Sequence, residues 1–94
     1  MNTQVETRQI LVLANNDYAE AMRVAAGLTI FGHGVAIVFV DRVVEETAEN
    51  IEQAELLELC DIEPLSMVDD PNITGIDRYR LCELIEQSQH IINI

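Results

Sequence analysis

Residues 8–41 read RQILVLANNDYAEAMRVAAGLTIFGHGVAIVFVD, and this stretch decides the fold. It contains two continuous apolar runs, ILVLA at residues 10–14 and VAIVFV at residues 35–40. Such runs are typical of strands that are buried on both faces of a parallel sheet. Between them, residues 18–31 place apolar side chains around most of a helical circumference. The stretch therefore predicts one right-handed strand–helix–strand unit.

Both ends of the predicted helix carry residues that favour a helix boundary. Asn15, Asn16 and Asp17 precede it, and side chains of this kind accept hydrogen bonds from the first free amides of a helix. His33 follows it between two glycines, where an imidazolium would interact well with the C-terminal end of the helix. Because the helix is more apolar than one sheet face requires, we expect a second surface to cover it. That surface is either another helix or a partner subunit.

The remainder of the chain continues the alternation of strands and helices. In order, we expect an amphipathic helix with an acidic outer face within residues 41–63, a short strand at 65–68, a loop at 69–72, a helix at 76–89 and a final strand at 90–94 that lies at the sheet edge. Thr74 and Asp77 are expected to cap the last helix. The fold predicted for residues 1–94 is one α/β domain with a disordered start at residues 1–7. It is a three-layer α/β/α sandwich with a mostly parallel sheet of about four strands in β-α-β-α-β-α-β order.

The charge of the chain limits its partners. The 94 residues have a formal net charge of −12 and include five arginines and no lysine. Nucleic-acid binding requires a basic surface, and an anionic membrane repels an acidic one, so we expect neither partner. The absence of lysine excludes Schiff-base chemistry and a P-loop. A basic protein, in contrast, would be steered toward the acidic helix.

The sequence indicates a cytoplasmic protein without a metal or cofactor. Residues 1–8 are polar and do not resemble a signal peptide, and no apolar run is long enough to cross a bilayer. The two cysteines, Cys60 and Cys82, have neither metal-site nor redox-motif spacing. No GxGxxG pattern supports a dinucleotide site.

Residues 10–44 resemble the opening of the DsrE/DsrF/DsrH superfamily of small sulfur-relay proteins. The resemblance rests on ILVLA in the first strand and on AEAMRVAAGLTIFGHGVAIVFV at residues 19–40, whose helix ends in Gly-His-Gly. Asp41, Arg42 and Val43 are similar to the short loop that follows in the family. Chain length and element order fit as well.

The resemblance implies an oligomer and a link to sulfur chemistry. Members of the superfamily commonly form dimers, trimers or hetero-hexamers, and some carry a cysteine that accepts sulfane sulfur as a persulfide. In those members the cysteine is expected just beyond the third strand. Residues 67–76 of this chain contain no cysteine, so it looks like a small member that lacks the usual acceptor.

Cys82 and Cys60 are nevertheless the candidate catalytic residues if the chain carries sulfur. Asp61 and its neighbouring carboxylates disfavour a thiolate at Cys60, and a buried structural role is the simpler interpretation of both cysteines. Arg78, one helical turn before Cys82, would favour a thiolate there, while Glu83 and Glu86 oppose that effect. Cys82 is therefore the stronger candidate.

Polar residues at the carboxyl ends of the strands are the candidate ligand-binding residues. Asn15, Asn16 and Asp17 follow the first strand and Asp41 follows the second, which is where open α/β sheets bind ligands. For the first three, helix capping is the favoured interpretation.

Three hypotheses follow for the function. The favoured one is an oligomeric accessory or binding subunit without catalysis of its own, assembled with copies of itself or with related subunits. The second is a persulfide carrier that uses Cys82 or Cys60. The third is a domain that senses a small ligand bound at residues 15–17 and at the loop of residues 69–72.

Overall fold

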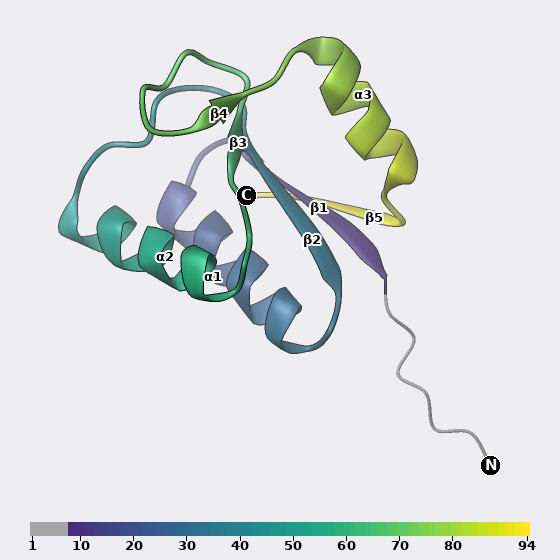
Figure 1. Cartoon of the computed structure of the whole chain (residues 1–94), viewed down its shortest axis with the longest axis horizontal. Coiled ribbons are helices and arrows are strands. Elements are labelled where there is room, and N and C mark those ends of the chain that lie inside the picture. Colours follow the sequence, from purple (N-terminus) through teal and green to yellow (C-terminus); the bar gives the residue numbers. More distant parts are fainter. Residues whose placement is uncertain (1–7) are drawn as a thin grey trace.

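A computed structural model describes residues 8–94, and the predicted disordered start lies outside the described residues. The described chain folds into five strands and three helices (Figure 1). Their order is β1 (Gln9–Ala14), α1 (Tyr18–Ile30), β2 (Gly34–Phe39), α2 (Ala48–Leu59), β3 (Leu65–Ser66), β4 (Thr74–Gly75), α3 (Arg78–Gln87) and β5 (His90–Asn93). None of the helices within residues 8–94 combines the length and the apolar character needed to span a membrane.

The strands form a single parallel sheet in the order β4-β3-β2-β1-β5. Helices α1 and α2 cover one face, and α3 covers the other (Figure 1). The predicted α/β/α architecture with a parallel sheet is confirmed. Strands β2, β3 and β4 are added one after another on one side of β1. Helix α3 then leads the chain back, and β5 pairs with β1 on its other side. This reversal is why α3 lies on the opposite face, since the crossover connections share one handedness.

Both faces of β1 and β2 are packed. Val12 and Ile37 belong to the core under α1 and α2, whereas Leu11 and Val38 belong to a second core under α3 that includes Leu84. All four strand residues have no exposed surface. Continuous apolar runs in the sequence reflect this double burial, because successive side chains point to opposite faces.

Helix α1 has the predicted ends. The Asp17 side chain accepts a hydrogen bond from the Glu20 amide at 3.1 Å, which confirms it as a cap. At the other end Gly32 has a φ of +91°, and the His33 amide donates to the Leu28 carbonyl at 3.3 Å. Backbone groups thus close this end in a Schellman motif. The His33 ring has a different role, because its Nδ1 accepts a hydrogen bond from the Arg8 amide at 3.2 Å.

The second surface that covers α1 is helix α2. Leu57 of α2 shares a core with Met22, Ala25 and Ala26 of α1, and Leu56 packs against that core. Of the two alternatives that the sequence leaves open, another helix therefore covers much of the apolar surface of α1.

Helix α2 is shorter than the acidic segment that contains it. It begins at Ala48, with Thr47 as the cap that accepts a hydrogen bond from the Asn50 amide at 3.1 Å. It ends in a second Schellman motif, in which Asp61 has a φ of +58° and the Ile62 amide donates to the Leu57 carbonyl at 3.0 Å. An aspartate thus occupies a backbone conformation that favours glycine.

The region after β3 differs from the prediction. Strand β3 has two residues rather than four, and Thr74–Gly75 forms the additional strand β4 beside it. Asp77 alone caps α3, by accepting a hydrogen bond from the Arg80 amide at 2.9 Å, whereas Thr74 belongs to the sheet. A two-residue strand is too short to show an alternating pattern, so β4 is not recognisable in the sequence.

Candidate functional site

Tyr18, the first residue of α1, ties the carboxyl end of β2 to the start of the helix. Its side chain is buried, and its ring packs on Phe39 with the ring centroids 4.7 Å apart. The hydroxyl donates to the Arg42 carbonyl at 3.0 Å and accepts from the Arg42 and Asp41 amides at 2.9 and 3.2 Å. The chain that leaves β2 is therefore held in one conformation.

The Arg42 guanidinium closes over this arrangement. Its Cζ lies 4.1 Å from the centroid of the Tyr18 ring, a cation–π geometry. Nη2 donates to the Asn16 carbonyl at 2.6 Å, and Nη1 donates to the Asn15 carbonyl at 3.3 Å. Exposed Asp41 contributes a carboxylate oxygen 3.6 Å from Nη1. Arg42 thus connects the loops after β1 and β2.

The amides at the start of α1 are already occupied. Both Asn16 and Asp17 donate their main-chain N–H groups to the Ile94 oxygen at 3.1 Å, and the Asn15 side-chain amide donates to the Asn93 side chain at 2.9 Å. This point lies between β1 and β5, where the strand order reverses and where open α/β sheets bind anions. Here a main-chain oxygen of the chain fills that position.

A polar hollow of about 370 Å³ lies beside these residues. Its lining includes Asn16, Asp17 and Tyr18 together with Arg42, Glu45 and Glu49. Of the four predicted ligand-binding residues, Asn16 and Asp17 line this hollow, whereas Asn15 and Asp41 do not. Tyr18 and Arg42, which the sequence does not indicate, contribute more contacts to this edge of the sheet than any of the four.

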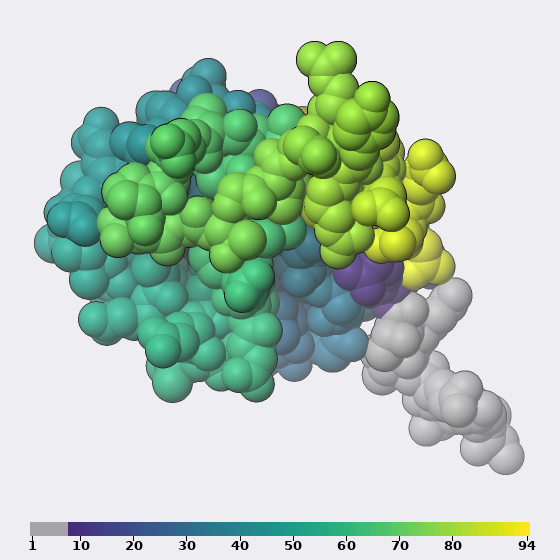
Figure 2. Space-filling view, turned by 45° about the horizontal axis from the view of Figure 1, so that its top comes forward, coloured from purple at the N-terminus to yellow at the C-terminus, as the bar shows by residue number. Residues whose placement is uncertain are grey.

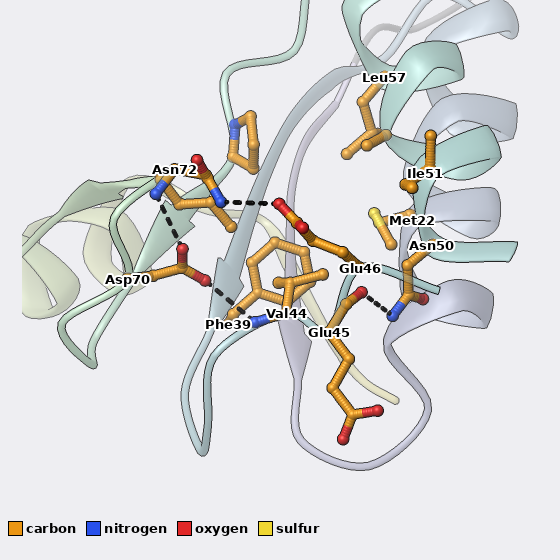
Figure 3. Close-up of a pocket in the computed structure, with 13 residues that line it drawn as sticks. Met22, Phe39, Val44, Glu45, Glu46, Asn50, Ile51, Leu57, Asp70 and Asn72 are labelled. Atoms are coloured by element: carbon orange, nitrogen blue, oxygen red, sulfur yellow. Dashed lines mark hydrogen bonds between the residues drawn. The ribbon is translucent and has the colours of Figure 1, made fainter. Parts of the chain in front are cut away.

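An apolar pocket of about 210 Å³ adjoins the polar hollow, and the two share Glu45 and Asn50. It opens between α2 and the loops after β2 and β3, at the carboxyl edge of the sheet (Figure 3). Met22, Phe39 and Leu57 form part of its lining, and each is only 1% exposed. In Figure 2 the teal and green segments, which carry these loops, lie next to each other on the left side of the view.

Asp70 fixes the two loops around the apolar pocket. It is 7% exposed, and its carboxylate oxygens accept hydrogen bonds from the Val44 and Asn72 amides, each at 3.0 Å. Glu46 reaches across from the first loop and accepts from the Asn72 side chain at 3.4 Å (Figure 3). The third hypothesis places a ligand at the loop of residues 69–72, and in the structure Asp70 of this loop positions both walls of the pocket.

The two cysteines lie on opposite faces of the sheet. Cys60 follows α2, packs against the core under α1, and has its Sγ 4.0 Å from the Ala26 carbonyl oxygen. Cys82 is exposed on α3. The sheet between them prevents the two thiols from acting together within one molecule.

The histidines lie at the amino edge of the sheet, away from both hollows. His33 accepts from the Arg8 amide, and the His90 Nε2 lies 3.4 Å from Nη1 of the same arginine. Across residues 8–94, the His, Cys, Asp and Glu side chains form no group of three or more that would hold a metal ion.

By its architecture the chain belongs to the three-layer α/β/α class. A search with protein-family models and a search of curated proteins both give no match to the chain. The candidate site is therefore defined by geometry alone.

Proposed function

We propose that the chain is a DsrE-like protein that acts as an oligomeric accessory or binding subunit in the context of sulfur relay, in the cytoplasm and without catalysis of its own. The family proposal is supported by the strand–helix–strand unit at residues 9–39 and by the continued alternation to β5. Assembly with copies of itself or with related subunits is supported by exposed apolar side chains at the ends of α1 and α2.

These side chains form what we call the helix-end patch: Ile30, Phe31 and Leu59, which are 73%, 75% and 81% exposed. Their elements converge because α1 packs against α2 and the Cys60 Sγ lies 4.0 Å from the Ala26 carbonyl, one turn before Ile30. Single exposed apolar residues are ordinary, but a group of large ones is typical of an interaction surface.

The charge distribution favours this patch as the place where copies meet. Residues 26–34 carry no carboxylate in a chain whose net charge is −12. The α1 part of the patch therefore adds little repulsion between copies, whereas Leu59 lies between Glu58 and Asp61. The acidic outer face of α2 would suit a basic protein partner.

Light scattering after size-exclusion chromatography tests the proposal. We expect the wild-type chain at about 100 µM to have a mass that is a multiple of the monomer, because interfaces of standard size have dissociation constants from about micromolar to picomolar. Phe31→Glu is expected to give a monomer. Tyr79→Glu is the matched control, since Tyr79 is 78% exposed but lies on α3. A monomeric wild type, or an equal effect of the two substitutions, would contradict the proposal.

A persulfide carrier is the second candidate, and the exposure of Cys82 supports it. In such a step the Cys82 thiolate attacks the outer sulfur of a donor persulfide, the S–S bond breaks, and the donor thiolate leaves. Mass spectrometry after incubation with a cysteine desulfurase and cysteine should show one added sulfur atom. The addition should persist in Cys60→Ser and disappear in Cys82→Ser. An unmodified wild-type chain would contradict this candidate.

A further inference from the structure

The apolar pocket has the size and chemistry of a binding site for one small molecule. Its volume of about 210 Å³ lies between that of a roughly 150 Å³ apolar cavity, which holds benzene, and the range of drug-sized sites. Its floor includes the fully packed side chains of Met22, Phe39 and Leu57, yet the space above them is open.

The wall of the pocket formed by α2 carries a small side chain at position 54. Ala54 is exposed on α2 and lines the pocket, while Ile51, one turn earlier, is 48% exposed at the same wall. A larger side chain at position 54 would cover the floor. The opposite wall is held in place by Asp70, so the pocket is formed before any ligand arrives.

All ionisable groups that line the pocket are acidic. They are Glu45, Glu46 and Asp70, and neither arginine nor histidine is among the lining residues. Asp70 uses both oxygens for main-chain amides, and the Glu45 carboxylate points away from the pocket (Figure 3). Glu46 remains, and its one hydrogen bond from Asn72 is 3.4 Å long. The Glu46 carboxylate points across the pocket toward the Asn72 side chain (Figure 3). An anion is repelled here, and a cation is attracted.

We propose that this pocket binds a small organic cation, with its apolar body against Phe39 and Leu57 and its charged group beside Glu46. The site is distinct from the helix-end patch, so it does not depend on oligomer formation. An aromatic or branched aliphatic amine with about the volume of a benzene ring and a short linker has the required shape.

Three probes of nearly equal size test the ligand class: 2-phenylethylamine, 2-phenylethanol and phenylacetate. NMR titration of the full chain is expected to show shifts at Phe39, Ile51 and Ile73 with the amine. The amine is expected to bind about fivefold more tightly than the alcohol, as one partly exposed charge pair allows, and phenylacetate is expected to bind least. Equal affinities for amine and alcohol, or no binding at millimolar concentration, would overturn the proposal.

Two substitutions test the location. Ala54→Leu is expected to lower the affinity for the amine at least about tenfold by filling the mouth, since a packed site tolerates little added volume. Ala48→Leu is the same change at an exposed position of α2 that does not line the pocket. It should leave the affinity unchanged. Glu46→Gln should make the amine and the alcohol bind equally. Unchanged affinity in Ala54→Leu, with the wild-type spectrum retained, would overturn the location.

Discussion

The two halves of the chain reach stability in different ways. The strand–helix–strand unit β1-α1-β2 has two six-residue strands and a helix with six buried residues. In the second half, β3 and β4 have two residues each, and α2 and α3 bury one residue each, Leu57 and Leu84. The first half forms the core through apolar contact, whereas the second half attaches to it through a few apolar anchors and polar clamps.

The largest expected difference between the halves comes from the same substitution in each. Leu11→Ala is expected to lower the free energy of unfolding by about 4 kcal/mol, because β1 lies between two paired strands and cannot move into the cavity. Leu84→Ala should cost only about 2 kcal/mol, because a single covering helix can shift toward the sheet. Urea unfolding followed by circular dichroism measures both. Equal costs would contradict the proposed difference.

Asp70 accepts hydrogen bonds from the Val44 and Asn72 amides, an arrangement that we call the Asp70 clamp. Its removal tests how far polar groups stabilise the second half. Asp70→Ala is expected to cost about 2–3 kcal/mol, since two amides lose a charged acceptor and one buried carboxylate position becomes empty. Exposed Asp69 is the adjacent control, and Asp69→Ala should change the unfolding free energy by less than about 0.5 kcal/mol. Similar effects of the two variants would show that the clamp adds nothing.

A stabilising substitution is expected at the end of α2. Asp61 has a φ of +58°, a conformation that glycine adopts without strain, and its charge opposes the C-terminal end of the helix. Asp61→Gly should therefore raise the free energy of unfolding by about 0.5–1 kcal/mol. Asp61→Asn removes only the charge and should give a smaller gain. A loss of stability in Asp61→Gly would contradict the assignment of strain to this residue.

The smallest effect is expected at an exposed ion pair in the first half. Arg23 donates to both Glu20 oxygens, at 2.6 and 2.7 Å, and this hydrogen bonding lowers the pKa of the Glu20 carboxyl. The pair's contribution to stability is present above the pKa of the unfolded glutamate and is lost as pH falls through the lower folded value.

Arg23→Gln should raise the pKa of Glu20 toward its ordinary value while hardly changing the urea midpoint, because the pair is exposed. An NMR titration of the Glu20 carboxyl measures the shift, and Arg80→Gln on α3 is the control. A large loss of stability in Arg23→Gln would show that surface pairs matter as much as the Asp70 clamp.

The difference in apolar burial between the two halves also explains which parts of the fold can be predicted from the sequence. Residues 10–14 and 35–40 are apolar throughout because both faces are buried, so the pattern alone indicates the strands and their parallel pairing. Strand β4 has no such pattern, because Thr74 and Gly75 are exposed and their contribution is two main-chain pairings with β3. The cap at Asp17 is local in sequence and is predicted, whereas the assignment of the last cap to Thr74 with Asp77 is only half right.

The candidate site depends on contacts between distant residues, and these are less visible in the sequence. Tyr18 meets Arg42 across 24 residues, and Asp70 meets Val44 across 26. From the sequence, Tyr18 is expected at the start of a helix, Arg42 in a loop and Asp70 in a turn. The position of the site at the carboxyl edge follows from the fold class, but its apolar floor and its acidic mouth require the folded chain.

Native-state hydrogen exchange by NMR on the full chain tests the difference between the halves most directly. Amides of β1, α1 and β2 are expected to exchange only through global unfolding, so their opening free energies should equal the free energy from urea unfolding. Amides of α3, β5 and the Val44 and Asn72 loops should exchange through smaller openings, with lower free energies. A single opening free energy for all of these amides, or faster exchange in α1 than in α3, would contradict a core formed mainly by the first half.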